Sequence, residues 1–269
     1  MKKRGFNKIG LVGAGNMGTS IIEGACRKGI LKGTAIAIYD KFPAKARSFA
    51  KAIRGKAAHS LEALIRGSDI LLLAIKPQDF PDFAVEAKKF LEKKQGVISI
   101  LAGFTVEKIR QGLGPVSVVR AMPNLGAKVG GAMTAITGQD KMLLGAAAEI
   151  FEGCGEVVTL PENAFDDVTA MSGSGPAYFF YLMELLTDFG VKRGIPAKVA
   201  ARLAIQTGLG AALLAKNSAD SCAELRQKVT SKKGTTEAAL KMLMKKRFGK
   251  IFQSALAAAA RRSRQLRAK

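Results

Sequence analysis

The sequence predicts an α/β protein in which a doubly wound parallel sheet is followed by an all-helical C-terminal domain. Two observations support this fold class. Short apolar runs alternate with helical patterns over roughly the first 150 residues, which is typical of a parallel sheet covered by crossover helices. From about Phe165 onward the strand patterns disappear and helical patterns dominate. We therefore expect one domain over residues 1–164 and a second over residues 165–269.

The first strand and the first helix meet at a glycine-rich turn. Residues 8–18 (KIGLVGAGNMG) pass from an apolar run into Gly13, Gly15 and Gly18, and a helical pattern begins at Met17. Gly13 allows the turn, Gly15 lets the backbone approach a pyrophosphate, and Gly18 lets the helix pack closely on the strand. The helix N-terminus attracts phosphate groups. Although three glycines also occur in ordinary turns, the flanking strand and helix favour a Rossmann-type dinucleotide site.

Asp40 ends the second predicted strand, residues 34–39 (TAIAIY), about 20 residues beyond the glycine-rich turn. A carboxylate here accepts hydrogen bonds from an adenosine ribose and repels a 2′-phosphate, which favours NADH. The basic residues that follow and can hold that phosphate are Lys41, Lys45 and Arg47. The sequence therefore leaves NADH and NADPH both open. A purely structural interpretation also stands, in which Asp40 and Pro43 open the next helix.

The remaining elements of the sheet domain follow in order. Helices are predicted at 43–53, 61–67, 79–93 and 105–113, and strands at 56–58, 70–75, 97–101 and 117–121. Ser60 is expected to cap the helix at 61–67. The run 70–75 is apolar on both faces, as in a central parallel strand, and Lys76 and Pro77 follow it at the edge where such sheets bind ligands. Asn124 lies in the turn MPNLG, where it either forms the turn or holds substrate or nicotinamide.

Small residues characterise the helical domain. The segment 172–178 (SGSGPAY) leads into a helix predicted at 177–191, and Pro196 opens a second helix. The small residues of this second helix, which permit close packing, are Ala200, Ala201, Ala204, Gly208, Gly210, Ala211 and Ala212. A third helix at 221–229, the loop TSKKGTT and two further helices complete the chain. Because bulky core residues are few, we expect a partner subunit to complete the core of an obligate homodimer.

Composition excludes several functional classes. The three cysteines, Cys26, Cys154 and Cys222, form no CxxC pair, which fits a reducing compartment. The single histidine, His59, rules out a histidine-based metal cluster or a Ser/His/Asp triad, and we expect no metal site. No apolar run reaches the roughly 18 residues that span a membrane, and no cleavable leader is recognisable. We expect a soluble, cytoplasmic protein without a membrane partner.

The formal net charge of +22 is concentrated near the C-terminus. Residues 232–269 contain twelve basic residues and one acidic residue, Glu237. Such a segment can attract nucleic acid through its phosphates. The terminal RRSRQLRAK has no aromatic residue for base stacking, so we interpret it as a solvated basic face and expect no nucleic-acid partner.

Several segments together identify a resemblance. They are GAGNMG (13–18), AIKP (74–77), VRAMPNLGAKVGGAMTAI (119–136), DVTAMSGSGPAYFF (167–180) and LRQKVTSKKGTTEAAL (225–240). From about residue 8 to about residue 260 the chain resembles pyrroline-5-carboxylate reductase, the NAD(P)H-dependent enzyme of the last step to L-proline. The resemblance implies an N-terminal Rossmann domain that binds the dinucleotide. It also implies a C-terminal helical domain for dimerisation and substrate binding, in dimers that often assemble further.

The resemblance also implies roles for particular residues. The cofactor-binding set is Gly13, Ala14, Gly15, Asn16, Met17, Gly18, Asp40, Ser60, Ala74, Ile75, Lys76 and Pro77. The loop that receives the substrate carboxylate contains Ser231, Gly234, Thr235 and Thr236. Asn124 is expected near the nicotinamide, and the Thr236 hydroxyl near the ring nitrogen. The candidate catalytic residues are therefore Thr236, Lys76 and Asn124.

Elementary chemistry is compatible with these roles. Reduction of a cyclic imine needs a hydride, a pocket for one carboxylate and a proton on nitrogen. Because the imine can arrive protonated, no strong protein acid is required. Free N–H groups at a helix beginning near Thr235 supply the anion site. Positioning and electrostatics then account for catalysis.

Two segments depart from the family pattern. The usual Ser-Pro-Gly-Gly-Thr-Thr is here Ser231-Lys-Lys-Gly-Thr-Thr236, and the usual Met-Pro-Asn-Thr-Pro is here Met122-Pro-Asn-Leu-Gly126. These changes leave open a related cyclic imino acid as substrate.

A β-hydroxyacid dehydrogenase-like enzyme is a further alternative, but no Lys and Asn stand at helical spacing near SGSGPAY. A dinucleotide-responsive scaffold or nucleic-acid binder is the non-enzymatic alternative.

Overall fold

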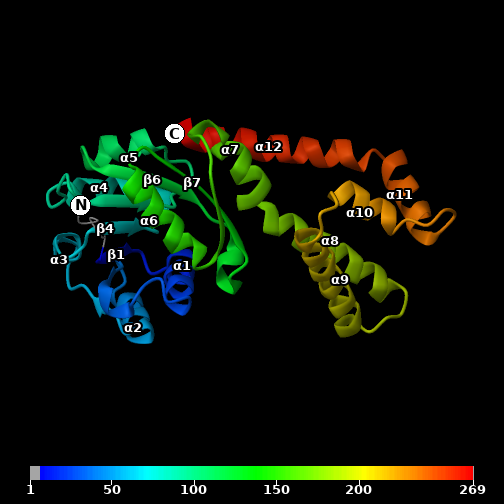
Figure 1. Ribbon diagram of the computed structural model, residues 1–269, viewed down its shortest axis with the longest axis horizontal. Coiled ribbons are helices and arrows are strands. Elements are labelled where there is room, and N and C mark those ends of the chain that lie inside the picture. Colours follow the sequence, from blue (N-terminus) through cyan, green and yellow to red (C-terminus); the bar gives the residue numbers. More distant parts are fainter. Residues whose placement is uncertain (1–6, 269) are drawn as a thin grey trace. The chain divides into compact units, whose positions relative to one another are not determined.

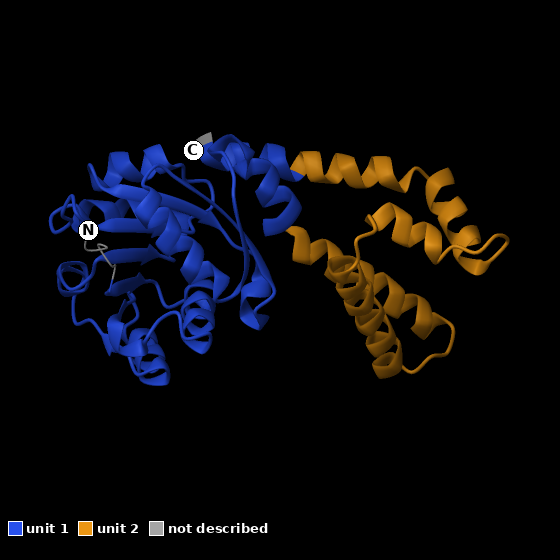
Figure 2. Cartoon of the chain, in the orientation of Figure 1, with its two compact units in different colours: residues 1–173, 259–269 blue, residues 174–258 orange. Residues whose placement is uncertain are grey.

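The computed structural model describes residues 7–268, which form two compact units (Figures 1 and 2). Unit 1 comprises residues 1–173 and 259–269, and unit 2 comprises residues 174–258. These units do not coincide with the predicted division between residues 164 and 165. The difference arises because residues 165–173 and the last turns of the chain pack with the sheet rather than with the helices of unit 2.

Unit 1 contains an eight-stranded sheet of order β3-β2-β1-β4-β5-β6-β7-β8. The strands are β1 (Ile9–Val12), β2 (Ile36–Tyr39), β3 (Lys56–Ala57), β4 (Ile70–Leu73), β5 (Gly96–Ser99), β6 (Ser117–Met122), β7 (Ala132–Gly138) and β8 (Gly155–Thr159). Neighbouring strands are parallel except β6 and β7, which are antiparallel. The doubly wound sheet is therefore confirmed, with one reversal. The segment between Met122 and Ala132 is too short for the crossover of about a dozen residues that parallel neighbours need.

Helices cover both faces of this sheet (Figure 1). One face packs against α1 (Asn16–Arg27), α2 (Pro43–Ile53) and α6 (Lys141–Glu152), and the other against α3 (Leu61–Arg66), α4 (Phe80–Ala87) and α5 (Val106–Leu113). Along β4, Ile70 and Leu72 join the first core, whereas Leu71 and Leu73 join the second. Successive side chains of a strand point to opposite faces, so an entirely apolar β4 fills both cores.

Most predicted elements occur with shifted ends. Ser60 caps α3 as predicted, because its Oγ accepts a hydrogen bond from the Ala63 N–H at 3.1 Å. The helix predicted at 79–93 is shorter, since α4 ends at Ala87. Beyond it, the Gln95 side chain accepts from the Glu92 N–H and donates to the Ile65 carbonyl, which holds residues 92–95 in a turn. The short 3-10 segments are η1 (Gly33–Ala35), η2 (Pro77–Asp79), η3 (Leu125–Val129) and η4 (Glu162–Ala164).

Two helical segments of unit 1 directly precede unit 2 in the sequence. These are α7 (Phe165–Val168) and the π-helix η5 (Thr169–Gly173). The last helix, α12 (Phe248–Ala268), begins in unit 2, and its residues from 259 onward belong to unit 1. The predicted loss of strands after Phe165 is confirmed over the described residues.

Unit 2 consists of helices alone. Besides the first part of α12 it contains α8 (Gly175–Lys192), α9 (Ala197–Asn217), α10 (Cys222–Lys228) and α11 (Thr235–Lys245). The most extensive packing within unit 2 is between α8 and α9, where a Cβ at Gly208 would lie only 2.8 Å from Met183 Cε. Across residues 174–258 the buried residues are Gly175, Gly190, Ala200 and Ala204, all of them small. No helix in the described part of the chain has the length and apolar character to span a membrane.

Candidate functional site

The glycine-rich turn has the geometry of a phosphate cradle. Gly13 adopts φ +95°, and a Cβ there would lie 2.7 Å from the Ala74 carbonyl oxygen. A Cβ at Gly18 would lie 2.7 Å from Ala74 Cβ, so this glycine permits α1 to approach β4. At Gly15 a Cβ would meet no atom within 4 Å. Gly13 and Gly18 are thus required by the fold, and Gly15 borders open space that a pyrophosphate fits.

The N-terminus of α1 is open toward the same space. Gly15 is its N-cap, no side chain caps it, and its first turn carries no acidic residue. The first N–H groups of a helix have no partner within the helix, and the helix dipole makes this end attractive to anions. Asn16, Met17 and Gly18 form this first turn. The residues present therefore fit a dinucleotide pyrophosphate.

A cavity of about 540 Å³ lies at the carboxyl ends of β1, β2 and β4. Its lining residues are Val12, Gly13, Gly15, Tyr39, Asp40, Lys41, Phe42, Lys45, Leu61, Ala74, Ile75, Lys76, Asp79, Asp82, Phe83 and Glu86. Ligands of open α/β sheets bind at this edge. The structure thus brings together six residues of the predicted cofactor set, Gly13, Gly15, Asp40, Ala74, Ile75 and Lys76.

Other members of the predicted set have different surroundings. Pro77 begins η2 directly after Lys76, at the same edge of the sheet. The Ala14 N–H donates to Asp40 Oδ2 at 2.8 Å. Ser60 is not among the lining residues, and its hydroxyl is engaged as the cap of α3. The cofactor role of Ser60 stays a prediction.

Asp40 connects two loops at the mouth of this cavity. Its Oδ2 accepts from Ala14 in the glycine-rich turn, and its Oδ1 accepts from the Phe42 N–H at 2.8 Å. Phe42 is the N-cap of α2. The carboxylate therefore helps to shape the start of α2 and also lines the cavity, so the two interpretations of Asp40 are compatible.

Asn124 forms its own turn. Its Oδ1 accepts from the Gly126 N–H at 3.1 Å, and its Nδ2 donates to Ser172 Oγ in η5 at 3.2 Å. The turn-forming interpretation is thus confirmed. Because the amide also ties the end of β6 to η5, Asn124 holds the carboxyl edge of the sheet against the segment that leads toward unit 2. Its role near the nicotinamide stays a prediction.

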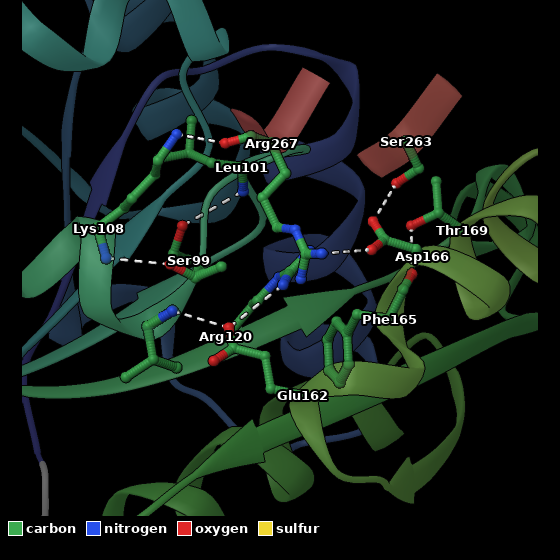
Figure 3. Close-up of polar contacts among 12 residues, drawn as sticks. Ser99, Leu101, Lys108, Arg120, Glu162, Phe165, Asp166, Thr169, Ser263 and Arg267 are labelled. Atoms are coloured by element: carbon green, nitrogen blue, oxygen red, sulfur yellow. Dashed lines mark hydrogen bonds and ion pairs between the residues drawn. The ribbon is translucent and has the colours of Figure 1, made fainter. Parts of the chain in front are cut away.

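Two residues before this turn, β6 carries a buried arginine (Figure 3). The Arg120 side chain is 1% exposed, its Nη1 donates to Glu162 Oε1 at 3.2 Å, and its guanidinium lies 4.7 Å from the centre of the Phe165 ring. Burial lowers the pKa of Arg120, whereas the hydrogen bond and charge of Glu162 act in the opposite direction. The guanidinium is therefore held by one carboxylate and one aromatic face.

Asp166 in α7 extends this cluster to the end of the chain. Its Oδ1 accepts from Ser263 Oγ at 2.7 Å, and its Oδ2 lies 3.3 Å from Arg267 Nη2 (Figure 3). Lys108 Nζ donates to the Arg267 carbonyl oxygen. Asp166 is buried, so these contacts attach the last turns of α12 to unit 1. Sequence reasoning missed this cluster, although a lone arginine within the apolar VVRAM was a usable signal.

The predicted carboxylate loop lies in unit 2 at the N-terminus of α11. Gly234 is the N-cap of α11 and no side chain caps it, while the Gly234 N–H donates to the Ser231 carbonyl at 3.0 Å. Thr235 and Thr236 form the first turn. An uncapped helix start of this kind can bind a carboxylate through its N–H groups.

The second lysine of this loop has an unusual conformation. Lys233 adopts φ +61°, a region that favours glycine. Its N–H donates to Glu237 Oε2 at 2.7 Å. This hydrogen bond, followed by the contact with Lys241, lowers the pKa of Glu237. Glu237 thus stabilises the strained loop from within α11.

The candidate catalytic residues come from both units. Lys76 and Asn124 belong to unit 1, whereas Thr236 belongs to unit 2. Lys76 is exposed at the carboxyl end of β4, and Thr236 is half-buried. Their joint role in catalysis stays a prediction.

Two known families match separate parts of the chain. Residues 162–266 match the family described as pyrroline-5-carboxylate reductase dimerisation. Residues 8–103 match the family described as NADP oxidoreductase, coenzyme F420-dependent. The two matches cover the helical part of the chain and the glycine-rich part of the sheet, respectively.

Similar proteins extend over nearly the whole chain. Pyrroline-5-carboxylate reductases from Synechocystis sp. and Pseudomonas aeruginosa are 36% and 35% identical, each over 96% of this chain and over 98% and 96% of their own. The structure of the Coxiella burnetii pyrroline-5-carboxylate reductase matches with a TM-score of 0.91 and 32% identity over 97% of this chain and 99% of that one. The Plasmodium falciparum pyrroline carboxylate reductase with NADP bound matches with a TM-score of 0.87 and 27% identity, over 98% and 100%.

Proposed function

Because the chain belongs to the pyrroline-5-carboxylate reductase family, we propose that it reduces 1-pyrroline-5-carboxylate to L-proline with NADPH or NADH. One observation supports this reaction beyond dinucleotide binding. Within the loop that the family resemblance assigns to the substrate carboxylate, α11 begins without a side-chain cap, so its first N–H groups are available to an anion. A reductase of a cyclic imino acid needs both a dinucleotide site and an anion site.

The residues of unit 1 bind and orient the dinucleotide. The N–H groups at the start of α1 receive the pyrophosphate, with Gly13 and Gly15 leaving the space for it. The ends of β2 and β4 supply Asp40 and the Ala74–Pro77 segment along the same cavity. When bound, the reduced nicotinamide supplies the hydride.

The residues of unit 2 orient the substrate. The N–H groups of Thr235 and Thr236 receive the carboxylate, and the Thr236 hydroxyl hydrogen-bonds near the ring nitrogen. The imine arrives with its proton, so neither residue has to act as a strong acid. Catalysis then comes from positioning and from electrostatic complementarity.

We propose that the chain acts as a homodimer through unit 2. Large apolar side chains on α8 and α9 are exposed in the single chain, including Phe179, Leu186 and Leu203. Exposed apolar surface of this extent is typical of an interface. Light scattering at micromolar concentration tests the proposal and also measures any assembly beyond the dimer. A single-chain mass would contradict it.

We also propose a reducing, cytoplasmic location. The three cysteines are free, and Cys154 is buried. Burial raises the pKa of the Cys154 thiol, which keeps it protonated and unreactive.

The direct test follows the oxidation of NADH and NADPH on addition of 1-pyrroline-5-carboxylate. A 2-keto acid serves as the control for a dehydrogenase acting on an oxygen substrate. Turnover with the imine and none with the 2-keto acid is the expected result. If neither dinucleotide is oxidised with the imine, the proposed reaction is wrong, and other cyclic imino acids become the substrates to try.

Thr236→Ala tests the substrate loop. We expect kcat to fall by about a hundredfold because one hydrogen bond to the reacting ring is lost, while the dissociation constant of the dinucleotide stays unchanged. Thr236→Ser retains the hydroxyl and is the matched control, which should recover most of the activity. Wild-type kinetics for Thr236→Ala would remove this residue from the site.

A further inference from the structure

We propose that Arg120 is a positioning residue for the reduction and acts through the Asn124 amide. The proposal rests on the proposed function and on the place near the nicotinamide that the family resemblance implies for Asn124. Arg120 lies on β6, and Asn124 is the N-cap of η3, two residues beyond the end of that strand. Arg120 is not among the residues that line the dinucleotide cavity. Its effect on the reaction therefore passes through other side chains.

The Asn124 amide is held at both of its polar atoms. Its Oδ1 accepts from the Gly126 N–H at 3.1 Å, and its Nδ2 donates to Ser172 Oγ at 3.2 Å. Gly126 belongs to the same turn, so this bond moves together with Asn124. Ser172 lies in η5, 48 positions further along the chain. The orientation of the amide thus depends on what fixes η5 against β6.

Arg120 holds the segment that ends in η5 (Figure 3). Residues 162–173 form η4, α7 and η5 in succession. The Arg120 Nη1 donates to Glu162 Oε1 at 3.2 Å, and its guanidinium lies 4.7 Å from the centre of the Phe165 ring. Thr169 Oγ1 donates to the Phe165 carbonyl oxygen at 2.7 Å, which joins the start of η5 to α7. From β6, Arg120 therefore fixes the beginning of the segment whose end bonds to Asn124.

Other contacts of this segment do not replace Arg120. Asp166 joins it to α12 and not to β6. Met122 of β6 packs with Phe165, but apolar packing is non-directional and does not by itself set the position of the segment along the strand. The charge-assisted hydrogen bond between Arg120 and Glu162 is directional and does set that position.

Burial of this arginine is unfavourable for stability by itself. The Arg120 side chain is 1% exposed, and its Nε and Nη2 donors have no hydrogen-bond partner among the described residues. Buried donors without partners are destabilising, and well-packed apolar side chains in place of a buried ion pair are often equally stable or more so. The folding of unit 1 alone therefore does not require a guanidinium at this position, whereas the positioning role does.

Steady-state kinetics with 1-pyrroline-5-carboxylate tests the proposal on Arg120→Met, on Asn124→Ala and on the double variant. Methionine fills the space without a charge or a donor, so we expect kcat to fall about tenfold because the amide loses its orientation. KM and the dissociation constant of the dinucleotide should stay within about twofold of the wild-type values. In the Asn124→Ala background, Arg120→Met should lower kcat by less than about a further twofold, because the side chain through which Arg120 acts is gone.

Lys108→Met is the matched control. Lys108 Nζ donates to the Arg267 carbonyl oxygen, so it joins α5 to the end of α12 beside the same cluster (Figure 3). This replacement also removes a charge and a hydrogen bond from unit 1, but it leaves residues 162–173 and β6 untouched. We expect a wild-type kcat. Hydrogen exchange of residues 169–173 should accelerate in Arg120→Met and not in Lys108→Met.

Ser172→Ala breaks the same connection at its other end. It leaves Arg120 in place and removes only a hydroxyl, so it decides the question even if Arg120→Met does not fold. A kcat about tenfold below the wild-type value supports the proposal, and a wild-type kcat overturns it.

Three further results would overturn the positioning role. They are a wild-type kcat in folded Arg120→Met, a loss that adds fully to that of Asn124→Ala, and an equal loss in Lys108→Met. Each of them leaves the proposed function intact, because the wild type still reduces the imine. Absence of turnover in the wild type contradicts the proposed function, and with it any role of Arg120 in that reaction.

Discussion

The two units of this chain use apolar residues in opposite ways. In unit 1 the large apolar side chains of β1 and β4, such as Leu11 and Leu72, are completely buried between two layers of helices. In unit 2 the side chains of comparable size lie on the surface, with Phe179 65% exposed and Leu186 46% exposed. Unit 1 therefore completes its own core, whereas unit 2 buries only small residues within the single chain.

This difference indicates where stability and association originate. Apolar surface that is already buried contributes to the folding of the chain itself. Apolar surface left exposed contributes only when a second surface covers it. The same kind of substitution should thus affect folding in unit 1 and assembly in unit 2.

Leu72→Ala should have the largest effect. Leu72 is fully buried in the middle of the sheet, so its truncation should lower the free energy of unfolding by about 4 kcal/mol. Urea unfolding followed by far-UV circular dichroism measures this, since the chain has no tryptophan. Val85→Ala, at a position 70% exposed on α4, is the control and should cost no more than about 0.5 kcal/mol. A small loss for Leu72→Ala would contradict a self-contained core in unit 1.

Asp166→Ala should have the next largest effect on the free energy of unfolding. It removes the carboxylate that holds Ser263 and Arg267, and it deprives Arg120 of a nearby negative charge. Removing one partner from a buried ion pair is strongly destabilising, and we expect about 3 kcal/mol here. Hydrogen exchange should accelerate in residues 259–268 more than in β4. Unchanged exchange there would show that Asp166 does not attach the end of α12 to unit 1.

Phe179→Lys and Leu186→Lys test the exposed apolar surface of unit 2. The two positions are seven residues apart on α8 and so share one face of the helix. If a partner covers this face, each lysine should weaken association by about 2 kcal/mol, measured as a concentration-dependent fall in mass by light scattering. Val85→Lys places the same charge on an exposed apolar site of unit 1 and should leave the mass unchanged. If all three variants change the measured mass to the same extent, the proposed difference between the two units is contradicted.

Local features of the fold were largely predictable from the sequence. The cap at Ser60 has the side-chain hydrogen bond that the sequence predicted for the start of α3. The glycine-rich turn has the positive φ at Gly13 and the close approach at Gly18 that its spacing suggested. Such features depend on residues within one or two turns of each other, so the pattern contains what determines them.

Features that join distant segments were not predictable in this way. Asp166 and Ser263 are separated by 97 positions, and no local pattern indicates that they meet. The ion pair between Arg120 and Glu162 also joins segments that no local pattern connects. Nor does a local pattern indicate that the residues of α12 from 259 onward belong to unit 1. The sequence predicted that a partner completes the helical core, but it did not indicate that large exposed side chains lie on α8. An apolar helix has the same sequence pattern whether its own chain or another chain covers it.

By itself the sequence determined the sheet with its covering helices, the glycine-rich turn and the all-helical second part. Steric freedom at glycine and the periodicity of apolar residues act over short stretches, and these forces are the same in every context. Only the tertiary structure decided that Asp40 is fixed by two backbone groups, that β7 runs opposite to β6, and that Asp166 holds the chain end. Those outcomes depend on which distant groups the packing of both cores brings within hydrogen-bonding distance.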